Sequence, residues 1–167
     1  MPADLTWCAR KKNGIRLIPP SPNVAQGYIA KARTALSVAE NSIRNEVFDW
    51  AIIASYYAQY DAAYALLMHA GIKCEIHECT IAILREIFTP QGIVTTEQCA
   101  QIEQAKEDRI DAQYYVKTPT TTQQATNALS KARILVLHME AALEKLHEDD
   151  VAALRKRIQD SIGNAKN

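Results

Sequence analysis

Residues 47–70 read VFDWAIIASYYAQYDAAYALLMHA, a run that contains neither proline nor glycine. Large apolar and aromatic residues recur along it with helical spacing, at Phe48, Ile52, Tyr56, Tyr60, Tyr64 and Leu67. A neighbouring stripe carries small residues, at Ala54, Ala58, Ala62 and Ala65. A helix with so much apolar perimeter must be covered on more than one side. We therefore predict that it is the central helix of a bundle and that it ends at Gly71.

Working outward from this helix, apolar periodicity and helix-breaking residues divide the remaining chain. Together they predict helices over 22–41, 46–70, 75–88, 96–116, 123–146 and 150–162. The connections between these helices are short, which favours antiparallel neighbours. The expected fold class is all-α, an up-and-down antiparallel bundle of four core helices with a C-terminal helix and an N-terminal arm. We expect the arm over 1–21, the bundle over 22–146, and the C-terminal helix and tail over 147–167.

Composition limits the functions that the chain can have. The chain has 167 residues, with 19 basic and 19 acidic side chains. This balance argues against a general nucleic-acid coat or a membrane-surface protein, which need excess positive charge. No apolar run is long enough to span a membrane. The four cysteines follow no disulfide framework, and no signal peptide precedes them. We therefore expect a cytoplasmic protein with reduced thiols and no disulfide.

The N-terminal arm is basic, with Arg10, Lys11, Lys12 and Arg16. It is either a solvated tail or a contact for phosphate or an acidic partner. Pro19, Pro20 and Pro22 separate it from the first long helix, whose start at Ser21-Pro22 combines a capping residue with proline in the first turn.

A cluster of cysteine and histidine follows the central helix, at Cys74, His77 and Cys79, with Cys99 further along. These side chains are the usual ligands of zinc. Closed zinc sites, however, present their cysteines in tight turns, whereas this segment runs into a helix. We therefore predict buried thiols, no metal and no cofactor, with His77 capping or hydrogen-bonding near the start of its helix.

Polar groups on the central helix allow two interpretations. Tyr56, Tyr57, Tyr60 and Tyr64 are either core residues with hydroxyls at the bundle edge or a stacking surface for bases. Asp61 lies among small residues on the same helix, and a buried carboxylate needs a partner, for which Arg109 is one candidate. Arg109 is itself either a buried ion pair or a cation held in a cleft to bind phosphate.

Two stretches together resemble the HEPN domain family. The first is SYYAQYDAAYALLMHAGIKCEIHECTIAIL, residues 55–84, and the second is RIDAQYY, residues 109–115. They are similar to the small archaeal and bacterial members with a tyrosine-rich central helix, a histidine opening the next helix, and an Arg-containing motif on a later one. The resemblance covers about residues 20–145.

The resemblance implies an all-α bundle that commonly forms a homodimer. Many members are encoded beside a minimal nucleotidyltransferase as toxin–antitoxin-like pairs, which makes that enzyme the implied partner. Active members are metal-independent ribonucleases with an Arg followed, after a short spacer, by a His. Arg109 matches the Arg, whereas Tyr114 or Tyr115 stands in the His position. Gln113 stands where these members often have Asp, and Asp111 lies two residues before that position. Tyrosine, with an ordinary pKa of about 10, transfers protons poorly at neutral pH.

These observations predict a functional cleft at Arg109, Asp111 and Tyr114, with His77 and Asp61 as further binding residues. Arg109 and Tyr114 are the candidate catalytic pair. The favoured function is a nucleotide- or RNA-binding bundle that acts with a minimal nucleotidyltransferase. One alternative is a metal-independent endoribonuclease toxin that uses Arg109 with His77 or Tyr114. The other is a non-catalytic dimeric interaction module.

Overall fold

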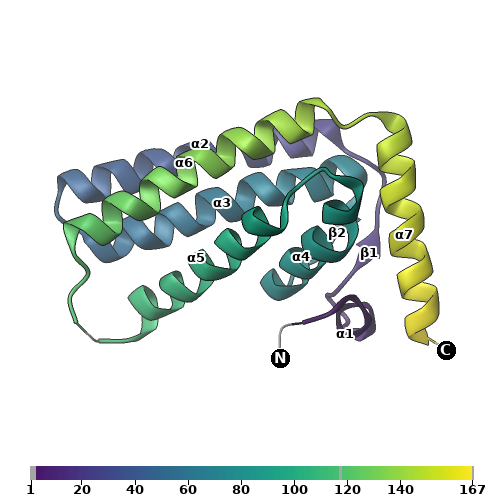
Figure 1. Ribbon diagram of the computed structural model, residues 1–167, viewed down its shortest axis with the longest axis horizontal. Helices are drawn as coiled ribbons and strands as arrows, with labels where there is room; N and C mark the ends of the chain where they lie inside the picture. Colours follow the sequence, from purple (N-terminus) through teal and green to yellow (C-terminus); the bar gives the residue numbers. More distant parts are fainter. Residues whose placement is uncertain (1–2, 117, 167) are drawn as a thin grey trace.

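Helix α3, Phe48–Ala70, lies at the centre of the protein. The computed structural model describes residues 3–116 and 118–166. Three other long helices pack along α3, namely α2 (Pro22–Arg44), α5 (Thr96–Tyr114) and α6 (Thr122–Glu144). Figure 1 shows α2, α3 and α6 running along the long axis of the molecule, while α5 packs against α3 from another side. The predicted all-α bundle is thereby confirmed.

Burial of α3 explains why its sequence is apolar on so many sides. Tyr56 and the alanines Ala58, Ala62 and Ala65 are fully buried, so both the bulky and the small stripe face neighbouring helices. Small residues allow close approach of a helix backbone, and large ones fill the space beyond it. Gly71 ends the helix in the left-handed conformation, with φ of 68°.

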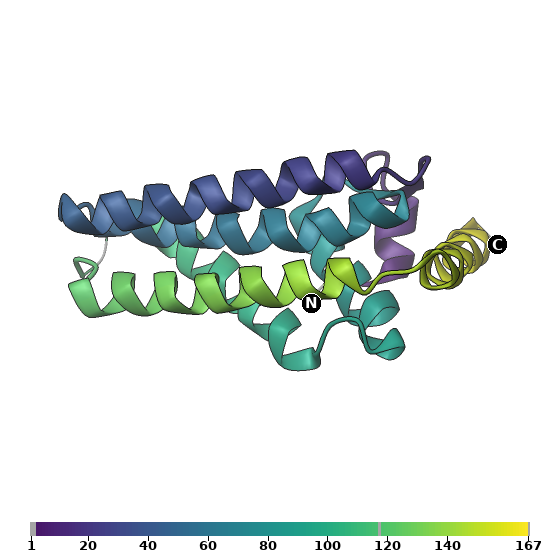
Figure 2. The same cartoon turned by 90° about the horizontal axis from the view of Figure 1, so that it is seen from above.

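The observed helix ends follow local chemistry. Ser21 caps α2, and Thr95 and Thr121 form capping boxes at the starts of α5 and α6. The single helix predicted over 75–88 is divided: α4 spans His77–Ile83, a π-helical turn spans Leu84–Phe88 and a 3-10 turn spans Thr89–Gln91. α7 covers Glu148–Lys166, longer than predicted. Figure 2 shows it nearly end-on, so it lies across the end of the bundle.

The N-terminal arm is packed rather than solvated. It contains a short helix, α1 (Leu5–Arg10), which the sequence pattern did not predict and which Asp4 caps through the Trp7 amide. Its strand β1 (Arg16–Leu17) pairs antiparallel with β2 (Ile72–Lys73). Apolar side chains of the arm join the main core, as Leu5, Cys8 and Ile15 are all buried.

The expectation of no disulfide is wrong, because Cys8 and Cys79 are bonded to each other with their Cα atoms 5.6 Å apart. The cause is the arm, which folds back so that α1 contacts α4. The pair is separated by 71 residues, and no local pattern signals such a contact. Cys74 and Cys99 are buried free thiols, as expected.

No helix within the described ranges is both long and apolar enough to cross a membrane.

Candidate functional site

Arg109 and His77 both contact one buried tyrosine, Tyr56. The Tyr56 hydroxyl lies 2.6 Å from Nδ1 of His77, the first residue of α4. The guanidinium carbon of Arg109, from α5, lies 5.1 Å from the centroid of the Tyr56 ring. Tyr56 occupies the bulky stripe of α3 and is fully buried. Three helices therefore contribute one side chain each to a single junction, which we call the Arg-Tyr-His junction (Arg109, Tyr56 and His77).

The chemistry of the junction follows from burial and charge. Burial raises the pKa of Tyr56 well above its usual range, although the charge and hydrogen bonding of Arg109 partly oppose the shift. The Tyr56 phenol is thus protonated at neutral pH. Burial also lowers the pKa of His77, and the positive charge of Arg109 lowers it further. His77 is therefore mainly a neutral imidazole at neutral pH, able to accept a proton.

A buried lysine lies on the same side of the protein. Lys106, one turn before Arg109 on α5, is only 9% exposed and contacts Glu78 and Glu107, each at 3.4 Å. Its charge acts on His77 in the same direction as that of Arg109 and lowers the pKa of the imidazole. Lys106 was not among the site residues predicted from the sequence. Its position three residues before Arg109 places it on the same helix face, and that spacing is the signal that would have identified it.

An aromatic groove adjoins His77, with a volume of about 790 Å³. Tyr60 stacks on the His77 ring with centroids 4.0 Å apart, and Tyr64 stacks on Tyr60 at 5.8 Å. The Tyr60 and Tyr64 hydroxyls bond to Thr80 and to the Cys74 carbonyl, as core tyrosines do. Tyr57 lines the same groove and is exposed. The tyrosines therefore serve the core and also form a groove wall.

Asp61 belongs to this groove and not to the Arg-Tyr-His junction. It is 7% exposed, and its Oδ1 lies 3.9 Å from Nζ of Lys31 on α2. Burial raises the pKa of Asp61, and Lys31 partly opposes the shift. Asp61 therefore pairs with Lys31 of α2 and not with Arg109, the partner considered from the sequence.

Tyr114 and Asp111 lie further along α5, around a separate hollow of about 750 Å³ near the end of that helix. Tyr114 is 65% exposed. On the same helix, Arg109 donates a hydrogen bond to Gln113, with 3.2 Å between Nη1 and Oε1. Of the sequence-predicted site residues, the structure brings Arg109 and His77 together through Tyr56, and places Asp61, Asp111 and Tyr114 elsewhere.

Residues 3–116 and 118–165 contain no group of three or more His, Cys, Asp or Glu side chains arranged to hold a metal ion. In the cysteine- and histidine-containing segment after α3, for which the sequence predicted no metal, Cys79 is bonded to Cys8 and the Cys74 thiol lies 3.0 Å from the Thr80 hydroxyl. The absence of a bound metal or cofactor remains a prediction.

Comparison with protein-family models gives a match. The family model described as HEPN domain matches residues 25–145, well over half of the chain. This range begins in α2 and ends just after α6, so it holds all three residues of the junction. No curated protein matches the chain.

Proposed function

The chain belongs to the HEPN domain family, and on that premise we propose that it binds RNA or nucleotides by holding a phosphate at the Arg-Tyr-His junction. The observation that carries this proposal is the convergence of Arg109 and His77 on the buried Tyr56. The guanidinium offers several donors in a planar fork, which suits two phosphate oxygens at once.

Arg109 is held firmly but is not fully engaged. Its Nε has no hydrogen-bond acceptor among the residues that the structure describes, but it is buried, so the terminal nitrogens are the donors that remain for a ligand. One terminal nitrogen is bonded to Gln113, and the Tyr56 ring supports the guanidinium plane. A cation fixed in this way loses little freedom when a ligand binds, which favours affinity.

The aromatic groove supplies a place for a base next to the phosphate. His77 lines the groove and also forms part of the junction. Exposed Tyr57 offers a ring on which a base can stack, and such stacking tolerates any base. The net charge of zero agrees with a local contact of this kind rather than with a broad basic coat.

The test is equilibrium binding of a short single-stranded RNA, measured by fluorescence anisotropy. Loss of a charged hydrogen-bond donor to phosphate is worth about 1.5–3 kcal/mol, so Arg109→Ala should weaken binding by about 10- to 150-fold. Arg157→Ala is the matched control, because Arg157 is exposed on α7 and carries the same charge. Equal affinities of the two variants would contradict the proposal.

The position of His77 favours a second candidate function, metal-independent RNA cleavage. In the tautomer whose Nδ1–H donates to the Tyr56 hydroxyl, Nε2 of neutral His77 is free to take the proton of a ribose 2′-hydroxyl as its oxygen attacks the adjacent phosphorus. The bond from phosphorus to the 5′-oxygen then breaks, leaving a 2′,3′-cyclic phosphate, and the leaving oxygen takes a proton from His77 or water. Arg109 would stabilise the charge on the phosphorane. This candidate replaces Tyr114 with His77 as the proton-transfer group.

Cleavage is tested with purified protein and labelled RNA in the presence of a chelator. The ribonuclease function requires that His77→Ala and Arg109→Ala both abolish cleavage while His147→Ala, at an exposed histidine, does not. Binding without cleavage by the unaltered protein would leave the first proposal standing and eliminate the second.

We further propose a homodimer and a minimal nucleotidyltransferase partner, both of which follow from the family. Large apolar side chains exposed on the bundle surface, among them Trp50, Ile134 and Leu137, support a contact with another chain. Sedimentation at micromolar concentration tests the homodimer, for which a monomer is the contradicting result. Co-purification of the protein with a minimal nucleotidyltransferase from the same cells tests the partner, and purification without such an enzyme is the contradicting result.

A further inference from the structure

Basic side chains of the N-terminal arm lie beside the aromatic groove. In the antiparallel pair of β1 and β2, Arg16 stands opposite Lys73, so both side chains leave the same side of this small sheet. Both contact the carboxylate of Glu75, Arg16 at 2.8 Å and Lys73 at 3.2 Å. Lys73 and Glu75 also line the groove. The groove and the arm therefore share this edge.

Two lysines continue the edge along the arm. Lys11 and Lys12 lie in the turn after α1, and the carbonyl of the next residue, Asn13, accepts a hydrogen bond of 2.9 Å from the Glu75 amide. The Gly14 amide closes the turn by donating to the Lys11 carbonyl at 3.1 Å. The backbone that carries both lysines is thus fixed next to a residue that lines the groove. We call the four cations the basic edge (Lys11, Lys12, Arg16 and Lys73).

The cations of the basic edge can be reached from solvent. Lys11, Lys12 and Arg16 are exposed, and 40% of the Lys73 side chain is exposed. The Lys11 ammonium lies 4.5 Å from the centroid of the exposed Trp7 ring. Exposed cations beside exposed aromatic rings are the combination that binds single-stranded nucleic acid, in which cations hold phosphates and rings stack on bases.

The arm differs in charge from the rest of the chain. Residues 1–21 contain four basic side chains and one acidic side chain, whereas residues 22–167 contain 15 basic and 18 acidic side chains. The net charge of zero therefore conceals a positive arm on a slightly negative bundle. Arg10 is the fourth cation of the arm, and its Nε donates to the Ala165 carbonyl of α7 at 3.3 Å, so it belongs to that contact. A local positive field of this kind attracts a polyanion to one part of the surface.

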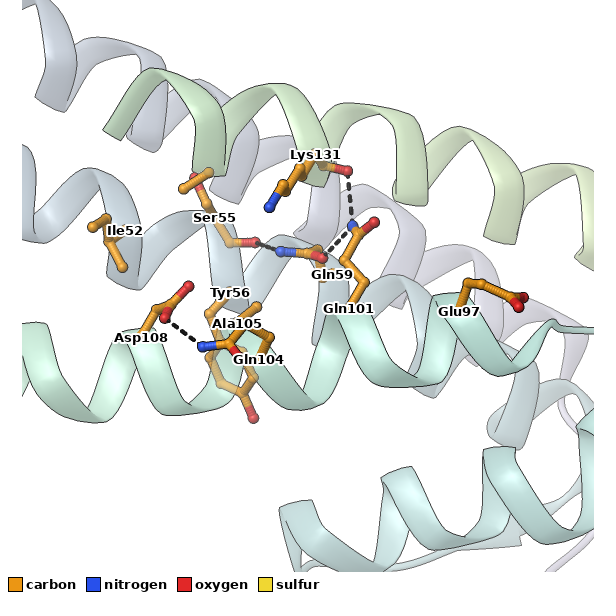
Figure 3. Close-up of a pocket in the computed structure, with 11 residues that line it drawn as sticks. Ile52, Ser55, Tyr56, Gln59, Glu97, Gln101, Gln104, Ala105, Asp108 and Lys131 are labelled. Atoms are coloured by element: carbon orange, nitrogen blue, oxygen red, sulfur yellow. Dashed lines mark hydrogen bonds between the residues drawn. The ribbon is translucent and has the colours of Figure 1, made fainter. Parts of the chain in front are cut away.

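Charge also decides the direction in which a strand of RNA can leave the Arg-Tyr-His junction. The cleft between α3, α5 and α6, drawn in Figure 3, is lined by the carboxylates of Glu97 and Asp108 and by one ammonium group, that of Lys131. The hollow near the end of α5 is lined by three carboxylates, those of Asp49, Asp108 and Asp111, together with the same ammonium group. Among the residues described, both linings are net negative and disfavour phosphate, whereas the groove leads to the basic edge.

We infer that the basic edge extends the RNA-binding surface beyond the aromatic groove, so that the protein binds a single-stranded RNA of several nucleotides rather than a mononucleotide. The inference rests on the proposed function, which places one phosphate at Arg109. Phosphates further along the strand then lie on Lys73, on Arg16 and on the two lysines of the arm. The arm precedes residues 25–145, so the match to the family model does not by itself imply this contact.

The test compares two RNAs, a dinucleotide with a single phosphate and an oligouridylate of about ten nucleotides. The double variant Lys11→Ala, Lys12→Ala should weaken binding of the longer RNA by about 5- to 30-fold, because each exposed charge contact contributes modestly. It should also lower the magnitude of the salt slope by about 1.4, the value for two phosphates. The dinucleotide should bind the double variant and the unaltered protein equally, because it fills only the junction and the groove.

Fluorescence anisotropy measures the longer RNA, and NMR titration measures the dinucleotide. The double variant Lys156→Ala, Arg157→Ala is the matched control, because these two neighbours are exposed on α7 and carry the same charge. The control should leave the affinity for both RNAs unchanged. Far-ultraviolet circular dichroism checks that each variant is folded.

Three results would overturn the inference. Unchanged binding of the longer RNA by Lys11→Ala, Lys12→Ala, together with weaker binding by Arg109→Ala, leaves the proposed function standing and assigns the arm to solvent or to an acidic protein. An equal loss in the control variant shows a general effect of net charge. An equal loss with the dinucleotide shows that the two lysines act at the junction itself. A different result, affinity for both RNAs that Arg109→Ala leaves unchanged, refutes the proposed function, so the two failures are distinguishable.

Discussion

Replacing Gly71 with alanine tests how the N-terminal arm packs over the end of α3. Gly71 has φ of 68°, and a Cβ there would meet the Ile18 carbonyl and would lie 2.7 Å from the Pro20 nitrogen. It would also push against Arg155, whose Nη1 donates to the carbonyls of Ile18, Ala70 and Gly71 at 2.8–3.0 Å. The backbone of the arm therefore has no room for a methyl group at this position.

The loss of folding free energy expected for Gly71→Ala has two parts, and a second glycine, Gly92, allows them to be measured separately. Gly92 has φ of 70°, but a Cβ there meets nothing within 4 Å. Gly92→Ala should thus cost only the left-handed strain of about 1–2 kcal/mol. Gly71→Ala adds the clash and the weakening of at least one charged hydrogen bond, about 1.5–3 kcal/mol more. The total for Gly71→Ala is about 3–5 kcal/mol.

Urea unfolding followed by circular dichroism measures both variants. With a slope of about 2 kcal/mol/M, Gly92→Ala should lower the midpoint by about 0.5–1 M and Gly71→Ala by about 1.5–2.5 M. Similar midpoints for the two variants would refute the reasoning, because they would mean that residues 18–20 do not lie over the end of α3.

Three further predictions concern titration and covalent structure. His77, followed by NMR, should titrate below its usual range, because burial and Arg109 lower its pKa, and Arg109→Ala should raise that pKa. The unfolded chain then binds a proton at His77 more readily than the folded protein does, so the free energy of unfolding should fall as the pH drops below about 6.5. A His77 pKa at its usual value would contradict this prediction. Cys8→Ser removes a bond to Cys79 across 71 residues, for which loop-closure theory gives a loss of about 4 kcal/mol. The unaltered protein should melt at a higher temperature than the variant without reductant, and a reductant that breaks the bond should remove the difference. Burial raises the pKa of Asp61, so Asp61→Asn should be more stable than the unaltered protein at pH 7. That difference should vanish below about pH 4, and a stability gain that persists there would have another cause.

The bundle itself was predictable because its signals are local. The apolar stripes of 47–70 and Gly71 define a central helix and its end, and Ser21-Pro22 marks the start of the first long helix; the structure contains each of them. Such features depend on residues a few positions apart, where helical geometry fixes which side chains meet.

The site was predictable only in part, because its contacts join distant segments. Arg109 and His77 were both identified from their motifs, but their meeting on Tyr56 depends on how three helices are rotated about their axes. The same holds for Lys31 beside Asp61, and for Cys8, which reaches Cys79 only because the arm folds back. Tyr114 was chosen because it stands in the His position of the family motif. The structure places it at the end of α5, beside a separate hollow and not at the Arg-Tyr-His junction.

The most direct test of the phosphate contact is the salt dependence of RNA binding. Each phosphate neutralised on a single strand contributes about 0.7 to the slope of log K against log salt concentration. If Arg109 holds one phosphate, Arg109→Ala should lower the magnitude of the slope by about 0.7, while Arg157→Ala leaves it unchanged. An unchanged slope in Arg109→Ala would show that RNA is bound elsewhere on the protein, and the Arg-Tyr-His junction would then not be the phosphate site.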